Sequence, residues 1–360
     1  MSNLMRYWGR KPVAIMEKIM KKIHGEVVDP FGGSGSTILT ALHHRNKAVY
    51  LDINPYAWLV AFVNIVEINP DEFMKEGNEV LKKLKEVNET SLNNDYLFYP
   101  DGDPFSTKGR IDKVTQLFPP DNFRKLYSIL KEIDNVETSP NVKIALYGTF
   151  CSSLFRSSKM NTKNGGSWVI PKYWVPKKYT KEDALHVFSS SMKTFYSYFK
   201  RNKGYKLNEN VKLLLENSLN FQYDENSILV TDPPYFDEIQ YMELSFFYWA
   251  WLRESKFVDT VKEILGENIE YKINEEIIVN QKKNVDHNSY LLLMKEFLKK
   301  TSRMKEKYLI FHHDNEKLKN SFIRIVKEEW GNIRIDNFAV DNHRSIGPRG
   351  SNKYILIYSK

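Results

Sequence analysis

The stretch that decides the fold is EVVDPFGGSGSTILTALHHR, at residues 26–45. A short apolar strand runs into a turn that contains three glycines, and an apolar stretch of helical character follows. Glycine lets the backbone turn tightly and lets a ligand approach the main chain at the carboxyl end of a strand. We therefore expect a strand, a ligand-binding turn and a helix in direct succession.

The next two segments extend this pattern. KAVYLDINP (47–55) predicts a second strand that ends at Asp52, and YAWLVAFVNIVEI (56–68) predicts a buried helix. Strand, glycine turn, helix, strand and acid form the start of a doubly wound α/β domain. In that geometry the Asp52 carboxylate accepts hydrogen bonds from a ribose diol. The alternative is that Asp52 only caps the turn at Asn54 and Pro55.

The α/β rhythm is interrupted once along the chain. It stops at about residue 67, resumes at VKLLLENSL (211–219) and continues through SILVTDPPY (227–235) and KYLIFHHDN (307–315). The last two extended runs, separated by GPRGS, predict an antiparallel hairpin at one edge of the sheet. We expect residues 1–66 and 208–360 to form one catalytic domain and residues 67–207 to form a large inserted region that is mainly helical.

The motif Asp232, Pro233, Pro234, Tyr235 directly follows the apolar strand SILV. The amino nitrogen of a nucleic-acid base is a poor nucleophile, because its lone pair is delocalised into the ring. A carboxylate at Asp232 and the carbonyl of Pro233 can each accept one N–H of such an amine and favour a pyramidal nitrogen. The prolines stiffen the turn, and Tyr235 offers a face for a base taken out of its stack. An ordinary turn at the end of a strand is the alternative.

The charge of the chain favours an anionic partner, since the formal net charge is +8 and the pI is about 9.1. Residues 156–181 concentrate this charge, with seven Lys or Arg, no Asp or Glu, and interleaved aromatic residues. Such a segment is typical of a surface that contacts phosphates and stacks on bases. A solvated loop with packed aromatic residues is the alternative. The candidate nucleic-acid contacts are Arg156, Lys159, Lys163, Trp168, Lys172, Trp174, Lys177 and Lys178.

Several classes of chemistry have no support in the sequence. A single cysteine, Cys151, excludes an intramolecular disulfide and a zinc site built from cysteines, and we expect no metal. The same cysteine lies in TFCSS and outside the Pro-Cys context of a cytosine-C5 methyltransferase. No apolar run is long enough for a membrane span, and the first residues lack the apolar stretch of a signal peptide. These features predict a cytoplasmic protein with no membrane partner.

The ordered pair DPFGGSGST and DPPY resembles the amino-methyltransferases of DNA, which act on adenine N6 or cytosine N4. The resemblance covers residues 29–66 and 211–251 well and the C-terminal strands loosely. It implies a Rossmann-like class I methyltransferase fold with a mostly parallel seven-stranded sheet, S-adenosyl-L-methionine as cofactor and DNA as partner. It also implies direct in-line transfer to a flipped base, without a metal or a covalent enzyme intermediate.

The resemblance also assigns site residues. Asp232, Pro233, Pro234 and Tyr235 are the candidate catalytic residues. YWGRKP (7–12) is similar to a short motif near the methionine end of the cofactor, although Lys11 could instead be a plain surface lysine. Asn217 and Ser218 lie where the family contacts the adenine ring of the cofactor. The candidate cofactor contacts are Trp8, Arg10, Lys11, Pro12, Asp29, Pro30, Phe31, Gly32, Gly33, Ser34, Gly35, Thr37, Asp52, Ile53, Asn54, Asn217 and Ser218.

More narrowly, DPPYFDEIQYMELSFFYWAWLRES (232–255) looks like a subgroup of adenine-specific DNA methylases, some of which carry a zinc ribbon that this chain cannot form. Cytosine-N4 transfer is the first alternative, but those enzymes more often have Ser than Asp at the start of the tetrapeptide. RNA guanine-N2 transfer is the second, and a catalytically inactive nucleic-acid-binding subunit is the third. A restriction or defence partner is compatible with the resemblance, which leaves the recognition sequence and the oligomeric state open.

Overall fold

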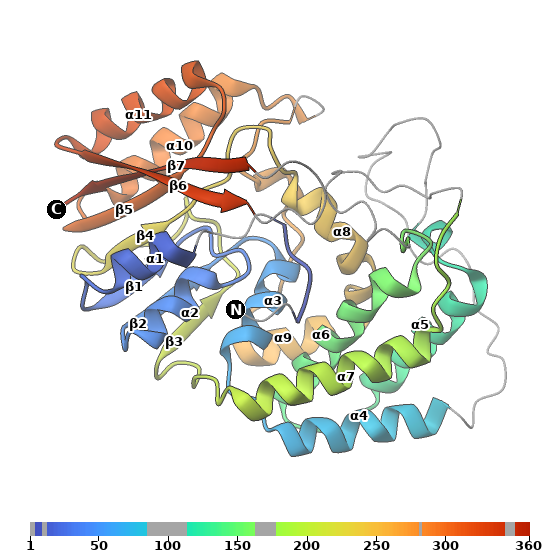
Figure 1. Ribbon diagram of the computed structural model, residues 1–360. Coiled ribbons are helices and arrows are strands. Elements are labelled where there is room, and N and C mark those ends of the chain that lie inside the picture. The colour runs from blue at the N-terminus through green and yellow to red at the C-terminus, as the bar shows by residue number, and fades with distance from the viewer. Residues whose placement is uncertain (1–3, 9–12, 85–113, 163–177, 281–282, 343–349) are drawn as a thin grey trace. The chain divides into compact units, whose positions relative to one another are not determined.

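The computed structural model describes residues 4–8, 13–84, 114–162, 178–280, 283–342 and 350–360 (Figure 1). The chain divides into two compact units. Unit 1 consists of Met1–Tyr7, Phe62–Gly204 and Tyr241–Glu270, and unit 2 consists of Trp8–Ala61, Tyr205–Gln240 and Tyr271–Lys360. Each unit is built from three separate stretches of the chain.

Unit 2 contains a seven-stranded sheet in the order β3-β2-β1-β4-β5-β7-β6 (Figure 1). The first five strands in this order are parallel, and β7 is antiparallel to both β5 and β6. The expected sheet, mostly parallel with an antiparallel hairpin at its end, is therefore confirmed. The strands are β1 (Glu26–Asp29), β2 (Lys47–Leu51), β3 (Val211–Leu214), β4 (Ile228–Thr231), β5 (Glu306–Phe311), β6 (Arg334–Asn342) and β7 (Gly350–Ser359).

The order of the strands reverses between β1 and β4. From β1 the chain moves outward to β2 and β3, and after a long excursion it returns to β4 on the other side of β1 before reaching β5. Val27 and Val28 of β1 pair with Ile228 and Leu229 of β4. Ligands of open α/β sheets bind outside the carboxyl ends of the strands at such a reversal point. The topology thus marks this edge of unit 2 as the place to look for a site.

Among the described residues, six helices belong wholly or partly to unit 2, and two of them cover the β4 and β5 end of the sheet. Leu309 and Phe311 of β5 share one core cluster with Phe297 of α10 and with Phe322 and Val326 of α11, and all five are fully buried. Burying each such side chain contributes about 1.5–3 kcal/mol. The helical elements are α1 (Val13–Met20), α2 (Ser36–His43), the first part of α3 (Pro55–Ile65), the short 3₁₀ helix η2 (Ile273–Glu275), α10 (His287–Thr301) and α11 (Glu316–Trp330).

Side-chain caps define where two of these helices begin. The Asp286 carboxylate accepts hydrogen bonds from the Ser289 main-chain N–H at 2.7 Å and from the Ser289 hydroxyl at 2.8 Å, and so caps α10. The Asn315 side chain caps α11 by accepting the N–H groups of Lys317 and Leu318. Such caps satisfy N–H groups that have no partner within the helix and typically contribute about 1 kcal/mol.

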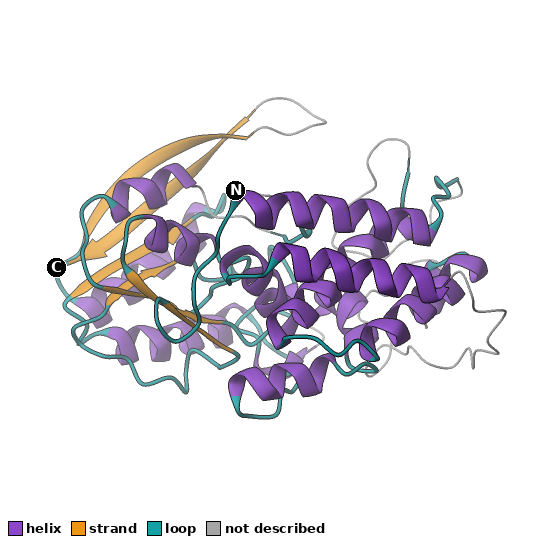
Figure 2. Ribbon diagram, turned by 90° about the horizontal axis from the view of Figure 1, so that it is seen from below, coloured by secondary structure: helices purple, strands orange, loops and turns teal. Residues whose placement is uncertain are grey.

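In unit 1 all the elements that the structure describes are helices, and Figure 2 shows the helices of the chain by colour. Within the insert predicted at 67–207, the described residues form helices and loops, in agreement with its expected helical character. These elements are α4 (Pro70–Leu84), the 3₁₀ helix η1 (Val114–Leu117), α5 (Pro120–Asp134), α6 (Pro140–Ser157) and α7 (Ala184–Arg201), with α8 (Tyr241–Leu252) and α9 (Phe257–Leu265) from later in the chain.

Aromatic side chains hold α8 against the earlier helices of unit 1. The Trp251 ring of α8 lies 5.1 Å from the Phe123 ring and 5.5 Å from the Phe150 ring, measured between centroids. Phe118 stacks on Phe247 of α8 at 5.5 Å. The stretch 241–270 therefore packs with the predicted insert, although it follows the DPPY motif in sequence.

None of the helices in the described part of the chain combines the length and the apolar character that a membrane span requires.

Candidate active site

The two sequence motifs lie side by side at the carboxyl ends of β1 and β4. The glycine turn follows Asp29, the last residue of β1, and DPPY follows Thr231, the last residue of β4. The Thr231 hydroxyl donates a 2.9 Å hydrogen bond to Oδ1 of Asp29, and both residues are almost fully buried. The Asp29 carboxylate also accepts the N–H of Phe31 at 3.3 Å. Asp29 thus connects the two loops from inside the protein.

The glycine turn has a backbone that other residues would adopt at a cost. Gly33 and Gly35 have φ values of 52° and 80°, in the left-handed region. A Cβ on Gly32 would lie 2.2 Å from Cε2 of Tyr50, so this position tolerates no side chain unless the Tyr50 ring moves. The Tyr50 hydroxyl donates a 2.8 Å hydrogen bond to the Gly33 carbonyl. Tyr50 of β2 therefore shapes the turn, a contribution that the motif itself does not reveal.

The Asp52 carboxylate links the end of β2 to the glycine turn. Its Oδ2 accepts the N–H of Gly33 at 2.9 Å, and its Oδ1 accepts the N–H of Asn54 at 2.9 Å. The second bond is the turn cap that the sequence leaves open as an alternative for Asp52. Because each carboxylate oxygen has a further lone pair, the cap does not prevent hydrogen bonds to a diol. Asn54 is buried, and its side chain in turn caps α3 at Tyr56.

The loop after β3 places Asn217 and Ser218, both buried, at the same edge of the sheet. The Asn217 side chain accepts the N–H of Leu219 at 2.9 Å and donates from Nδ2 to Oε2 of Glu275 at 2.9 Å. The Ser218 carbonyl accepts the Tyr223 hydroxyl at 2.8 Å. Glu275 lies in η2, 58 residues along the chain from Asn217, and no sequence signal links the two. The structure adds this carboxylate to the candidate site.

The N-terminal motif is only partly described. Trp8 is 8% exposed, and its ring lies 6.3 Å from the ring of Tyr56 at the start of α3. Its indole is therefore part of the core of unit 2. Arg10, Lys11 and Pro12, the other predicted contacts of this motif, lie outside the described residues.

The DPPY loop is held by side chains within it and around it. The Tyr235 hydroxyl donates to Oδ1 of Asp232, and the hydroxyl of Tyr290 from α10 donates to the Pro234 carbonyl at 2.6 Å. The next residue, Phe236, is fully buried and has a φ of 43°. A positive φ is a strained conformation for an aromatic residue and is tolerated where the surroundings hold it in place. Sequence reasoning finds the tetrapeptide but neither Tyr290 nor this strain.

Ring contacts orient the Tyr235 side chain. Its ring meets that of Phe311, at the end of β5, in an edge-on contact at 5.2 Å, and that of His312 at 6.3 Å. The Nδ1 atom of His312 lies 2.7 Å from the Lys353 carbonyl of β7. Tyr235 is half-buried, and these two contacts set the orientation of its ring beside the end of β5.

Carboxylates gather beyond the DPPY loop. Burial of the Glu238 carboxyl, followed by repulsion from Asp314 and then from Asp237, raises the pKa of Glu238 to about 7. Burial is also the main reason why the pKa of His313 is lowered. The described residues contain no group of three or more His, Cys, Asp or Glu side chains suited to hold a metal ion.

The structure describes only part of the basic segment, residues 156–181. Arg156 forms an ion pair with Glu182, with its Nε 3.2 Å from Oε1, and the Lys159 Nζ donates to the Gln116 carbonyl at 3.0 Å. Both cations thus have partners within unit 1. Lys178 is exposed. The remaining predicted contacts, Lys163, Trp168, Lys172, Trp174 and Lys177, lie outside the described residues.

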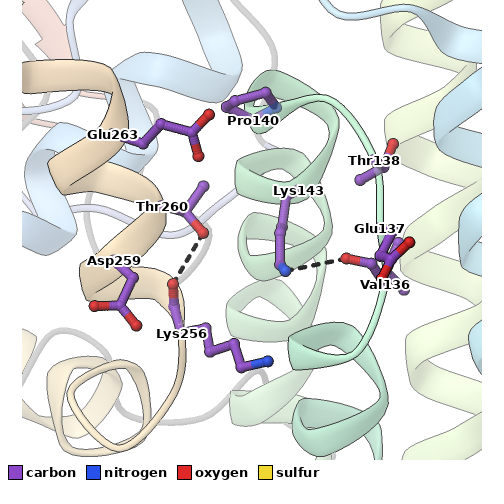
Figure 3. Close-up of a pocket in the computed structure, with 9 residues that line it drawn as sticks. All are labelled: Val136, Glu137, Thr138, Pro140, Lys143, Lys256, Asp259, Thr260 and Glu263. Carbon is purple, nitrogen blue, oxygen red and sulfur yellow. Dashed lines mark hydrogen bonds between the residues drawn. The ribbon is translucent and has the colours of Figure 1, made fainter.

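A cavity of about 370 Å³ lies within unit 1, between α6 and α9 (Figure 3). Among its lining residues, Lys143 has partners within the protein, because it donates from Nζ to the carbonyls of Asp134 at 3.1 Å and Val136 at 3.0 Å. Burial, and then the nearby charge of Lys256, lowers the pKa of Lys143. None of the predicted site residues lines this cavity, which the packing of the helices and the capping of α5 by Lys143 explain.

Comparison with known proteins identifies the family of this chain. Residues 9–309 match the model of the D12 class N6 adenine-specific DNA methyltransferase family, a span that contains both motifs. Neither a search of curated proteins nor a search of solved structures finds a match. Enzymes of this family methylate adenine in DNA at N6 with S-adenosyl-L-methionine as cofactor. The match covers well over half of the sequence, and the chain therefore belongs to the D12 class of N6 adenine-specific DNA methyltransferases.

Proposed function

We propose that the carboxyl ends of β1 to β4 form the cofactor and catalytic site of this methyltransferase, with the roles of individual residues given below. The observation that carries the proposal is the hydrogen bond from Thr231 to Asp29. It puts the glycine turn and the DPPY loop next to each other at the point where the strand order reverses. A methyl donor in one loop and an acceptor amine in the other would then be in contact.

The glycine turn fits S-adenosyl-L-methionine in two respects. Its positive φ values and the tight approach of Tyr50 to Gly32 leave a bare main chain facing the ligand side, and the Asp52 carboxylate stands at the adjacent strand end. We assign Asp52 to the ribose diol, and Asn217 and Ser218 to the adenine ring. Glu275 joins them, because it holds the Asn217 amide. The remaining cofactor contacts proposed from the sequence are Trp8, Arg10, Lys11, Pro12, Asp29, Pro30, Phe31, Gly32, Gly33, Ser34, Gly35, Thr37, Ile53 and Asn54.

The cofactor supplies an electrophilic methyl group on a positively charged sulfur. The protein supplies acceptors for the amine that attacks it. Asp232 and the Pro233 carbonyl each accept one N–H of the adenine amino group, which turns the nitrogen lone pair toward the methyl group. Asp232 is half-buried, and a carboxylate at this position also stabilises the positive charge that develops on nitrogen. Transfer would be direct and in line: the nitrogen–carbon bond forms as the carbon–sulfur bond breaks, and the methylated amine then gives up one proton to solvent. Its rate depends mainly on holding the two reactants in contact.

The target adenine reaches this site by leaving the base stack, since its amino group is not accessible to the enzyme inside a duplex. We propose that Tyr235, whose ring also makes a T-shaped contact with Phe311, then stacks on the flipped base. In the structure its hydroxyl donates to Asp232. We propose that this phenol keeps the Asp232 carboxylate oriented until the adenine amino group arrives. The amino group then donates to the same carboxylate, either beside the phenol or in its place.

Recognition of a specific DNA site is assigned to the inserted region 67–207. Its basic segment 156–181 supplies contacts to phosphates and aromatic groups for stacking. Because Arg156 and Lys159 have partners in the protein, we assign the phosphate contacts mainly to Lys163, Lys172, Lys177 and Lys178. A cytoplasmic enzyme that marks host DNA for a restriction or defence partner is consistent with this assignment.

Sequencing the genomic DNA of an expressing host for modified bases tests the proposal. We expect N6-methyladenine at one short sequence motif in cells with the native enzyme, and none in cells with an Asp232→Ala variant produced at the same level. Methylation that persists in the Asp232→Ala cells would remove Asp232 from the proposed role. Methyladenine scattered without a sequence context would contradict site-specific recognition.

A further inference from the structure

We propose that Tyr290, at the start of α10, is a positioning residue for methyl transfer: its hydroxyl fixes the Pro234 carbonyl and thereby orients the neighbouring Pro233 carbonyl toward the amine. This inference rests on the proposed role of the DPPY loop. It adds a residue 56 positions from that loop, which acts through the main chain and does not touch the substrate.

The loop contains two adjacent carbonyls, those of Pro233 and Pro234, and the proposed function uses the first of them. Proline fixes φ near −65°, and a residue before proline is restricted to extended conformations. Asp232 and Pro233 both precede a proline, so the loop between them has little freedom. Successive carbonyls in such a backbone point in different directions, because it completes a turn every three residues. Once the Pro234 carbonyl is bound to Tyr290, the direction of the Pro233 carbonyl is largely set.

The hydrogen bonds of the loop agree with this division. The Tyr290 hydroxyl meets the Pro234 carbonyl at 2.6 Å, a short bond for a neutral pair. Among the residues that the structure describes, none donates a hydrogen bond to the Pro233 carbonyl. Pro233 can therefore accept an N–H from the substrate, whereas Pro234 already has a partner.

Tyr290 is rigidly held. It is fully buried, and it lies in the first turn of α10, where the Asp286 cap fixes the helix terminus. Its main-chain N–H donates to the Asp286 carbonyl at 3.0 Å. Burial, together with the negative charges of Glu238 and Asp232, raises the pKa of the Tyr290 phenol well above 10. The phenol therefore stays protonated and remains a donor at every pH at which the enzyme works.

The strained residue Phe236 closes the other side of the loop. Its ring packs 4.5 Å from the Tyr290 ring and 5.1 Å from the His313 ring, and its carbonyl accepts the N–H of Val279 at 2.8 Å. Tyr290 thus makes two contacts with the segment after Asp232, one to the main chain and one ring to ring. Together they hold in place a backbone with a positive φ, which a short loop alone would not maintain.

The test removes the hydroxyl and keeps the ring. We expect Tyr290→Phe to lower the single-turnover rate of methyl transfer about tenfold at saturating DNA and S-adenosyl-L-methionine, because the Pro233 carbonyl is no longer oriented. The Kd for S-adenosyl-L-methionine and the KM for DNA should stay within twofold of the native values. A residue with only a structural role would not produce this separation between rate and binding.

Thr301→Val is the matched control. This substitution removes another buried hydroxyl, at the opposite end of α10. The Thr301 hydroxyl donates to the Phe297 and Leu298 carbonyls. It should lower thermal stability about as much as Tyr290→Phe but leave the transfer rate unchanged. A native rate in Tyr290→Phe, or an equal loss of rate in both variants, would overturn the inference. Asp286→Ala loosens the start of α10 and should therefore also lower the single-turnover rate. This variant provides a second test if Tyr290→Phe does not fold.

An Asp232→Asn variant assayed in parallel separates this inference from the proposed function. If Asp232→Asn retains the native rate, the catalytic assignment of the loop is wrong. If Asp232→Asn is inactive while Tyr290→Phe is fully active, only the role of Tyr290 is refuted.

Discussion

The Thr231 hydroxyl donates a hydrogen bond of 2.9 Å to the Asp29 carboxylate, so the last residue of β4 is tied to the last residue of β1. These two positions are 202 residues apart in sequence. Asp29 is the first residue of DPFGGSG and Thr231 directly precedes DPPY, so this bond ties the glycine turn to the DPPY loop.

The acceptor role of Asp232 gives the most direct prediction. Asp232→Ala should reduce methyl transfer about a hundredfold or more, because a preorganised group that stabilises the charge developing on the amine is removed. The Kd for S-adenosyl-L-methionine should change by no more than a few fold, since this side chain lies on the acceptor side of the site. Titration calorimetry and single-turnover assays measure the two quantities separately. A large loss of cofactor affinity would assign Asp232 to the cofactor instead.

The glycine turn should be sensitive to the smallest possible side chain. Gly32→Ala places a Cβ against the Tyr50 ring, whose hydroxyl holds the Gly33 carbonyl, and we expect cofactor affinity to fall at least tenfold. Gly331→Ala is the control, because Gly331 also occurs at the end of an element but a Cβ there meets open space. Its φ of 75° and ψ of −118° make alanine there destabilising, by about 1–3 kcal/mol, without an effect on cofactor binding. Equal affinity in the two variants would contradict the assignment of the turn.

The salt dependence of DNA binding tests the basic segment. Replacing Lys163, Lys172, Lys177 and Lys178 by glutamine should reduce the slope of log affinity against log salt by about one for each phosphate that the variant no longer neutralises. Lys47→Gln is the control, because Lys47 is exposed at the amino end of β2, away from the loops of the site. An unchanged slope in the fourfold variant would assign the segment to another role. Arg156→Gln should instead destabilise unit 1, since Arg156 pairs with Glu182.

The stability of unit 1 should depend on Asp134. This residue is 5% exposed, and its Oδ1 accepts the Tyr147 hydroxyl at 2.8 Å and the N–H of Lys256 at 3.0 Å. Asp134→Ala removes the acceptor of the buried Tyr147 hydroxyl and of the Lys256 N–H, which should cost about 1–3 kcal/mol in the free energy of unfolding. Asp121→Ala, which removes a half-exposed carboxylate paired with Lys125, should cost less than about 1 kcal/mol. Urea titration of both variants measures the difference.

Glu72 should make part of the stability depend on pH. Its Oε1 accepts hydrogen bonds from the Thr138 hydroxyl at 2.6 Å and from the N–H of Ser139, at the start of α6. These bonds lower the pKa of Glu72 below its usual value of 4.5, with Thr138 making the largest contribution. The stabilisation is therefore complete above pH 4.5, where the carboxylate is charged in both states. It disappears as the pH falls through the lower pKa of the folded state.

The matching variant is Glu72→Gln. It should lose about 1 kcal/mol of stability at neutral pH, because its neutral amide oxygen accepts weaker hydrogen bonds than the carboxylate does, and should show a smaller decline than the native enzyme between about pH 5 and pH 3. Denaturant midpoints across this range decide the question. Parallel pH profiles for the two proteins would show that Glu72 does not contribute.

The sheet could be predicted from the sequence because its strands have a local signature. DPFGGSGST follows an apolar strand, and the final hairpin is marked by two extended runs around GPRGS. Adenine is favoured by Asp rather than Ser at position 232, and the family match confirms that choice. These features need only residues that are close together in the chain, so patterns of hydrophobicity and turns are enough to find them.

Contacts between distant residues could not be predicted in this way. The Tyr290 hydroxyl donates to the main-chain carbonyl of Pro234. Every residue has such a carbonyl, so the sequence of the tetrapeptide does not indicate that Tyr290 is its partner. Glu275 reaches Asn217 from the short 3₁₀ helix η2, whose sequence has no distinctive composition. The sequence also does not predict that α8 and α9 pack with the helices of 67–207. The aromatic residues of 241–252 would fit any apolar neighbour.

The chain threads through the two units in turn, so neither is a continuous piece of polypeptide. If residues 67–207 recognise the target sequence, as proposed above, exchanging that stretch alone would not give this enzyme a different target. Residues 62–204 and 241–270 would have to be exchanged together, because the Phe123 and Phe150 rings of the first stretch pack on Trp251 of the second. A natural relative that changes its target by recombination would face the same requirement. It would need two crossovers before the DPPY loop and two after it, one at each end of the two stretches.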